Sequence, residues 1–91
     1  MGWIMKIIDL REKSLYDISH VEGSINIPYE YLISNYKTIL NKSETYYFYC
    51  NKGILSNRVV NILSSLGYKA FTLEKWFYLY YNYVDEYVRV C

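Results

Sequence analysis

The 91-residue sequence is poor in the residues that build several classes of protein. It has two cysteines, one proline, four glycines and one histidine, and its formal net charge is +1. Two cysteines, Cys50 and Cys91, are too few for a small domain built on disulfides, which normally carries about four or more. A net charge near zero gives no general attraction for nucleic acids or anionic membranes, so any anion must bind at a local site.

Apolar runs long enough to cross a bilayer are also missing from the sequence. The aromatic stretch from Trp76 to Val84 falls well short of the roughly 20 residues that a transmembrane helix needs. The start, Met1 to Lys6, has neither the apolar stretch of a signal peptide nor a myristoylation motif. We therefore expect a cytoplasmic protein with reduced thiols and with neither a membrane nor a nucleic acid as partner.

The composition that remains is that of a folded domain. Hydrophobic residues make up 53% of the chain and charged residues 21%, which is typical of globular proteins. A chain of this length has room for one hydrophobic core. We therefore expect a single domain over residues 1–91.

The hydrophobic pattern predicts strands that alternate with helices. Short apolar or β-branched runs predict strands at 4–10, 24–27, 45–50 and 68–73, the third being central in the sheet. Apolar spacing predicts helices at 29–40, from a cap at Ser56 to a left-handed terminator at Gly67, and from Glu74 through the aromatic run. Because parallel strands need crossover connections, the class is α/β, with a small parallel sheet and helices on both faces.

Cys50 ends the strongest predicted strand and precedes a predicted helix, which is where parallel sheets bind their ligands. A thiol becomes a good nucleophile when it ionises, and a helix N-terminus or a nearby cation favours ionisation. The loop after Cys50 offers free amides, Lys52 adds a positive charge, and Gly53 permits a tight turn. We therefore expect an anion-binding cradle. The simpler alternatives are a buried core cysteine and, for Lys52 and Arg58, solvated surface charges.

Several segments, in order along the chain, carry a family resemblance. They are Ile-Asp-Leu-Arg-Glu at 8–12, His-Val-Glu-Gly-Ser-Ile-Asn-Ile-Pro at 20–28, Tyr-Cys-Asn-Lys-Gly at 49–53, Leu-Gly-Tyr at 66–68 and Leu-Glu at 73–74. Each motif alone is weak, but the set is specific. Over roughly residues 4–84 the sequence resembles the rhodanese-like domain.

The resemblance implies a sulfurtransferase. Cys50 would take sulfane sulfur from thiosulfate or a similar anion and hold it as a persulfide, until a thiol, a cyanide-type acceptor or a protein removes it. The substrate-binding loop would consist of Asn51, Lys52, Gly53, Ile54, Leu55 and Ser56. Asp9 and Arg11 would support the site structurally, with Arg11 paired to Glu74, and His20 would be a hydrogen-bonded turn residue. Neither a metal nor a cofactor is expected.

Departures from the family pattern keep other hypotheses open. Leu55 stands where many active relatives have Arg, Ser or Thr, and Lys75-Trp76 replace the usual paired glycines. The alternative function is therefore a catalytically weak rhodanese-like binding or regulatory module. A phosphatase or arsenate reductase would need an arginine that closes the cysteine loop, and Ser56 stands there. A zinc site lacks clustered ligands, and a Cys-x-x-Cys motif is absent.

Overall fold

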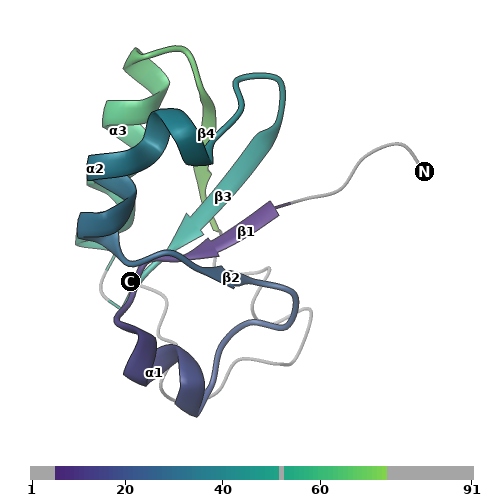
Figure 1. Cartoon of the computed structure of the whole chain (residues 1–91), viewed down its shortest axis with the longest axis vertical. Helices are drawn as coiled ribbons and strands as arrows, with labels where there is room; N and C mark the ends of the chain where they lie inside the picture. Colours follow the sequence, from purple (N-terminus) through teal and green to yellow (C-terminus); the bar gives the residue numbers. More distant parts are fainter. Residues whose placement is uncertain (1–5, 52, 74–91) are drawn as a thin grey trace.

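The computed structural model describes residues 6–51 and 53–73, and its strands form one parallel sheet. The strands are β1 (Lys6–Asp9), β2 (Ile25–Asn26), β3 (Thr45–Tyr49) and β4 (Lys69–Thr72), in the order β2-β1-β3-β4. The helices are α1 (Lys13–Ile18), α2 (Tyr29–Ile39) and α3 (Ile54–Ser65) (Figure 1). The predicted α/β class with a parallel sheet is therefore confirmed, as is the interior position of the strand that leads to Cys50.

The predicted elements match the observed ones closely, with one omission. Each of the four expected strands is present within one or two residues of its predicted ends, and α2 ends one residue earlier than expected. Helix α1 was not predicted. It has six residues, none of them buried, and this is too short for a helical hydrophobic period to emerge. The helix expected from Glu74 onward lies outside the described residues.

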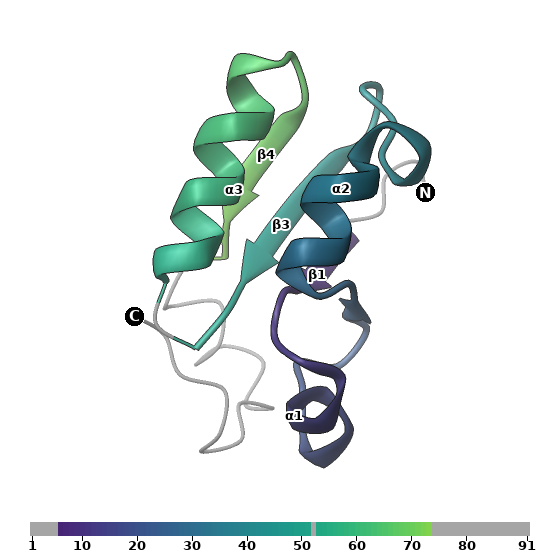
Figure 2. The same ribbon diagram turned by 60° about the vertical axis from the view of Figure 1, so that its left-hand side comes forward.

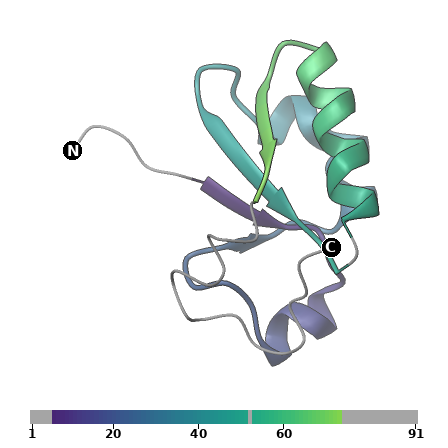
Figure 3. The ribbon, with the colours of Figure 1, turned by 180° about the vertical axis from the view of Figure 1, so that it is seen from behind.

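Helices α2 and α3 lie side by side over one face of the sheet. Figure 2 shows α3 in front of β4 and α2 in front of β1, with β3 visible between the two helices, and Figure 3 shows the strands from behind the view of Figure 1. Both helices begin near the carboxyl end of the sheet, and α1 lies beyond the end of β1 (Figures 1 and 2). Loops and helix starts therefore gather at the edge where parallel sheets bind ligands.

The core fills the space between the sheet and these two helices. Ile8 and Phe48, partners in neighbouring strands, are almost completely buried against α2 and α3. The helices contribute Leu32, Val59 and Leu63, each with no exposed surface. A core of this kind holds the end of β3 rigidly, because close-packed side chains leave little freedom to move. Within the described ranges, no helix is long and apolar enough to cross a membrane.

Gly67 ends α3 as the sequence predicts. Its φ of 98° lies in the left-handed region, which glycine adopts without steric cost. The Tyr68 amide donates to the Leu63 carbonyl at 3.0 Å and the Gly67 amide to the Ser64 carbonyl at 3.1 Å. This pair of hydrogen bonds is the Schellman arrangement, which caps the last carbonyls of a helix and turns the chain toward β4.

Candidate active site

Cys50 follows β3 directly, and its side chain lies on the helix-covered side of the sheet. Successive side chains of a strand point to opposite faces, so Tyr49 and Cys50 face different surroundings. Cys50 belongs to the buried core cluster and is 6% exposed. It also lines a cleft of about 690 Å³. The sulfur is thus largely shielded from water yet borders a space that a small molecule can enter.

The segment after Cys50 forms two hydrogen bonds with the sulfur, one as donor and one as acceptor. The Gly53 amide donates to Cys50 Sγ at 3.0 Å, and Ser56 Oγ lies 3.6 Å from Sγ. Gly53 has a φ of 75° and occupies the N-cap position of α3. This left-handed conformation turns the amide toward the sulfur, and the N-terminal end of a helix stabilises negative charge. The Gly53 amide and the start of α3 therefore both border the sulfur.

Ser56 does not have the role that its sequence position indicated. Helix α3 begins at Ile54, with Gly53 as its N-cap, so the expectation that Ser56 caps the helix is wrong. The left-handed turn at Gly53 starts the helix earlier than a serine cap would. Ser56 is buried inside the first turn and donates a hydrogen bond to the Gly53 carbonyl at 3.1 Å. Its hydroxyl therefore lies beneath the sulfur, between Sγ and the loop backbone.

The other predicted loop residues lie at different depths around the cleft. Asn51 and Leu55 are half-buried and line it, whereas Ile54 lines it with 59% of its surface exposed. Lys52 lies outside the described residues. Leu55, at the position where a polar residue was noted as missing, also packs partly against the core, which explains why an apolar side chain is tolerated there.

The remaining lining of the cleft is mainly apolar, with charged side chains among it. Leu10, Leu15, Pro28 and Tyr29 face the same space. The charged lining residues are Arg11, Glu12, Glu30 and Arg58. Arg58 is exposed, as a surface charge would be, but it also borders the site. Sequence reasoning did not predict that Glu12 and Glu30 would meet Arg58 at one cleft, because they come from three separate segments.

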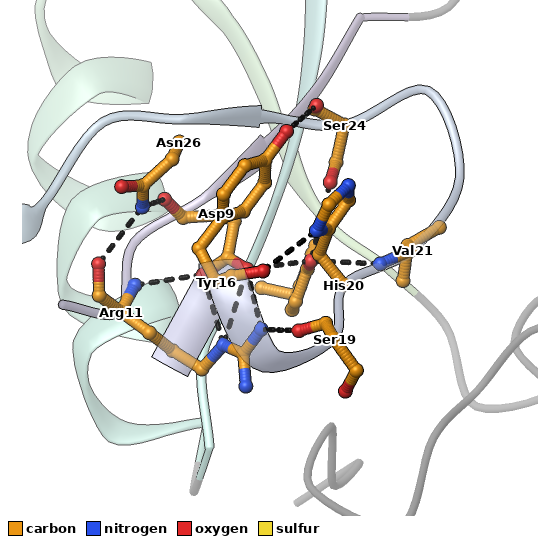
Figure 4. Close-up of polar contacts among 9 residues, drawn as sticks. Asp9, Arg11, Tyr16, Ser19, His20, Val21, Ser24 and Asn26 are labelled. Atoms are coloured by element: carbon orange, nitrogen blue, oxygen red, sulfur yellow. Dashed lines mark hydrogen bonds and ion pairs between the residues drawn. The ribbon is translucent and has the colours of Figure 1, made fainter. Parts of the chain in front are cut away.

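Asp9 and Arg11 form a buried ion pair beside the cleft (Figure 4). Arg11 Nη2 lies 2.7 Å from Asp9 Oδ2, and the Arg11 amide donates to Asp9 Oδ1 at 2.8 Å. Arg11 Nη2 also donates to the Ser19 carbonyl at 2.6 Å. Burial by itself lowers the pKa of Arg11, but the hydrogen bond and charge of Asp9 outweigh it and raise that pKa. The predicted partner Glu74 lies outside the described residues.

Tyr49 completes this network from the neighbouring strand, and sequence reasoning did not identify it. Its hydroxyl donates to Asp9 Oδ2 at 2.7 Å and accepts from the Val21 amide at 3.1 Å. Burial raises the pKa of Tyr49 well above its ordinary value, and the hydrogen bond to Asp9 acts in the same direction. The sequence shows only that Tyr49 precedes Cys50 by one residue, because the pairing of Tyr49 with Asp9 depends on a strand register that the structure supplies.

His20 is a structural residue, as predicted. Its ring stacks on Tyr16 with a centroid separation of 3.7 Å, and Nδ1 lies 2.7 Å from the Tyr16 carbonyl (Figure 4). A carbonyl can only accept, so Nδ1 carries the proton. The Tyr16 hydroxyl donates to the Ser24 carbonyl at 2.6 Å. These contacts close the turn between α1 and β2. Groups of three or more His, Cys, Asp or Glu placed to hold a metal ion are absent from residues 6–51 and 53–73.

Comparison with known proteins agrees with this arrangement. The model of the Rhodanese-like domain family matches residues 2–81. Thiosulfate sulfurtransferase PspE of Escherichia coli is 39% identical over 62 residues, which are 67% of this chain and 60% of PspE. A tRNA sulfurtransferase of Thermoplasma acidophilum is 37% identical over 71% of this chain but only 13% of that protein. Among solved structures, a rhodanese with anions from E. coli superimposes with a TM-score of 0.66 at 34% identity, covering 76% of this chain and 84% of that one.

Proposed function

Because the chain belongs to the rhodanese-like domain family, we propose that it is a sulfurtransferase that carries sulfane sulfur as a persulfide on Cys50. The proposal depends on the surroundings of the Cys50 sulfur. Cys50 Sγ lies near the start of α3 and accepts a hydrogen bond from the Gly53 amide at 3.0 Å. Cys50 also borders a cleft. These are the surroundings in which a cysteine becomes a nucleophile.

The loading step transfers one sulfur atom to the protein. The Cys50 thiolate attacks the outer sulfur of a donor such as thiosulfate, a new S–S bond forms, and the donor's S–S bond breaks. Sulfite leaves with the electron pair of the broken bond, so charge balances without an added oxidant. The Gly53 N–H, which donates to Sγ at 3.0 Å, stabilises the negative charge of the thiolate and then of the persulfide.

The unloading step returns Cys50 to its starting state. A nucleophilic acceptor, such as a thiolate or cyanide, attacks the outer sulfur of the persulfide, and the electron pair of the broken bond stays on Sγ. The two steps make a ping-pong cycle in which donor and acceptor use the same site in turn. The remaining loop residues Asn51, Lys52, Ile54 and Leu55 surround the donor in this proposal, and a protein acceptor is a further option. The buried Asp9–Arg11 pair fixes the end of β1 beside the cleft.

The proposal takes thiosulfate as the donor and the cytoplasm as the location. The name of PspE states thiosulfate, but the matched part of this chain spans 60% of that relative. A reducing compartment suits a cycle that begins from a free thiol. Both parts are separable from the central idea, because Cys50 can carry sulfur from another donor.

Intact-mass spectrometry after incubation with thiosulfate or an organic persulfide tests the proposal. We expect the wild-type protein to gain the mass of one sulfur atom, which cyanide then removes, and Cys50→Ser to gain none. Cys91→Ser is the matched control and retains the gain. Sulfur that remains cyanide-removable in Cys50→Ser, or a wild type that loads from neither donor, would contradict the proposal.

A second function, a rhodanese-like binding or regulatory module with weak catalysis, is favoured by one observation. Leu55 places an apolar side chain in the cleft where many active relatives have a polar one, which removes a contact to an anionic donor. Steady turnover of thiosulfate by the wild type would argue against this alternative. A single loading event without turnover would support it.

A further inference from the structure

The two edges of the sheet differ in how well their backbone is covered. The outer strands are β2 and β4. In β4 the Leu73 amide donates to the Phe48 carbonyl, so the alternate residue Ala70 directs its backbone N–H and C=O outward. Ala70 is nevertheless only 3% exposed, and its carbonyl accepts a hydrogen bond from Ser64 Oγ of α3 at 3.4 Å. The β4 edge is therefore covered at its centre.

The β2 edge is open by comparison (Figure 1). The Ile27 amide donates to the Asp9 carbonyl at 2.9 Å, so the preceding residue, Asn26, directs its backbone N–H and C=O away from β1. In the part of the chain that the structure describes, neither of these two groups has a hydrogen-bond partner. Unpaired groups of this kind on an edge strand can pair with a further strand.

A second cleft, of about 570 Å³, lies at this edge. Among the described residues, only Pro28 lines both this cleft and the one at Cys50. The apolar lining comes from α1, the end of β2 and α2, and consists of Tyr16, Ile27, Pro28, Tyr31 and Ile39. The charged lining residues Lys13 and Asp17 balance each other in an ion pair of 2.8 Å. The cleft therefore suits an apolar side chain better than an ion.

Ile25 is an exposed apolar side chain beside this cleft. It is 51% exposed although it belongs to the sheet. Its register partner Ile8 lies in the core under the helices, and paired residues of neighbouring strands share a face, so Ile25 lies on the helix-covered face as well. Ile25 does not line the cleft of its own chain. One edge thus carries an open backbone pair, an exposed isoleucine and an apolar cleft.

We propose that β2 pairs with β2 of a second copy of this chain, antiparallel about a two-fold axis at Asn26. In this register the two Asn26 residues lie opposite each other and exchange two backbone hydrogen bonds. Ile25 of one copy lies opposite Ile27 of the other, in the closely spaced position without hydrogen bonds, and enters the cleft that Ile27 lines. The same contact forms twice, as a two-fold interface requires.

The neighbours of Asn26 in sequence also fit this symmetric register. Pro28, which has no amide, lies opposite Ser24 of the second copy. The Ser24 amide donates to the Val21 carbonyl and its carbonyl accepts from the Tyr16 hydroxyl, so neither needs a partner across the interface. The formal net charge of +1 gives little repulsion between two copies. The edge is thus complementary to itself, which favours a second copy over a different protein.

The position of α2 leaves room for the side chains at the interface. Helix α2 lies in front of β1 (Figure 2), so the α2 helices of the two copies would be three strand spacings apart, roughly 14 Å. Helices in direct contact pack at about 8–10 Å. Tyr31, which is 59% exposed and lines the cleft, fills the remaining gap together with Ile25 of the second copy.

Sedimentation equilibrium of the full chain tests the proposal. Concentrations from about 10 µM to about 1 mM cover the affinities expected of a small interface. We expect the mean mass of the wild type to rise toward that of a dimer. Ile25→Lys should raise the dissociation constant at least about tenfold, because it removes an apolar side chain from each cleft. Phe71→Lys is the matched control, because Phe71 is 50% exposed but lies on β4 at the other edge. Thermal melting verifies that each variant is folded.

Disulfide cross-linking tests the register in a Cys50→Ser/Cys91→Ser background. Residues 25 and 27 of the two copies would have Cα atoms about 4.5 Å apart, within the range of a disulfide. A mixture of Ile25→Cys and Ile27→Cys proteins should therefore form mixed dimers under mild oxidant. Ile25→Cys alone should link much more slowly, because its two thiols lie in diagonal positions about 7–8 Å apart.

The outcomes decide the proposal independently of the chemistry at Cys50. A wild type that stays monomeric at about 1 mM would overturn it and leave the cleft to a different protein. A dimer that Phe71→Lys dissociates and Ile25→Lys does not would place the interface at β4. Equal cross-linking in the mixture and in Ile25→Cys alone would contradict the register. Ile25 does not line the cleft at Cys50, so Ile25→Lys should load sulfur as the wild type does, and a failure of loading in both would count only against the proposed function.

Discussion

Tyr49 and Cys50 are neighbours in sequence but belong to two regions of opposite character. On one face of the sheet, Tyr49 joins Asp9 and Arg11 in a network whose hydrogen bonds are short and whose members are almost fully buried. On the other face, Cys50 Sγ accepts a hydrogen bond from the Gly53 amide, and Cys50 borders the cleft. The period of two in a strand therefore places a buried polar anchor on the opposite face of the sheet from Cys50.

The difference between the two regions indicates how the domain would support the sulfur carrier that we propose. The anchor satisfies its buried charges internally, which a buried ion pair requires if it is not to destabilise the fold. On the Cys50 side, the proposed mechanism gives the Gly53 amide the role of stabilising the charge on the sulfur. We therefore expect changes in the anchor to affect mainly stability and changes in the loop to affect mainly sulfur loading. The following variants test that division, beginning with the largest expected effect.

Asp9→Asn should have the largest effect on stability. The change leaves the buried Arg11 guanidinium without its carboxylate, and breaking a buried pair in this way costs about 3–5 kcal/mol. Urea denaturation measures the loss of unfolding free energy. Asp17→Asn is the matched control, because it removes an exposed pair with Lys13 worth only about 0.3–0.5 kcal/mol. A loss below about 1 kcal/mol for Asp9→Asn would show that the anchor is not essential to the fold.

Tyr49→Phe should cost about 1.5–3 kcal/mol, the range for a hydrogen bond to a charged group. The change should also alter how the free energy of unfolding depends on pH in the alkaline range. The pKa of Tyr49 is raised in the folded state, so its contribution is fully present below the unfolded value near pH 10 and is lost as the pH rises above it, by up to about 1.4 kcal/mol per pH unit. Denaturation between pH 8.5 and roughly pH 11 should show a shallower decline in the variant.

Tyr31→Phe is the control for this alkaline comparison, because Tyr31 is 59% exposed. The free energy of unfolding of this variant should decline with rising pH as that of the wild type does. An alkaline slope in Tyr49→Phe as steep as that of the wild type would contradict the role given to burial of the hydroxyl.

Gly53→Ala should lower both the free energy of unfolding and the rate of sulfur loading, with the larger relative change in the loading rate. Alanine is strained at a φ of 75° by about 1–2 kcal/mol, and relief of the strain turns the amide away from Sγ. Gly67→Ala imposes the same kind of strain at a φ of 98°, far from the site and with only ordinary contacts to Lys42. Loading kinetics by mass spectrometry should therefore be several-fold slower in Gly53→Ala alone. Equal rates in the two variants would remove the Gly53 amide from the mechanism.

Ser56→Ala should have the smallest effect. The change removes the hydroxyl that accepts from the Cys50 thiol at 3.6 Å and donates to the Gly53 carbonyl at 3.1 Å. Loss of one hydrogen bond is worth about 0.5–1.5 kcal/mol, which corresponds to roughly a two- to tenfold slower loading rate. Ser65→Ala is a close control, because Ser65 Oγ also donates to the carbonyl three residues earlier, in the same helix but at an exposed position. Unchanged loading in Ser56→Ala would limit Ser56 to packing beneath the loop.

The sequence alone determined the alternation of strands and helices, the end of α3 at Gly67 and the position of Cys50 after a central strand. These features depend on local periods and on the conformational freedom of glycine, which a short window of sequence contains. The tertiary structure decided which side chains meet. The start of α3 at Ile54 depended on the left-handed turn at Gly53, and the network of Tyr49 depended on strand register. The cleft joins Glu12, Glu30 and Arg58 from separate segments, and only the packing of the helices against the sheet brings such residues together.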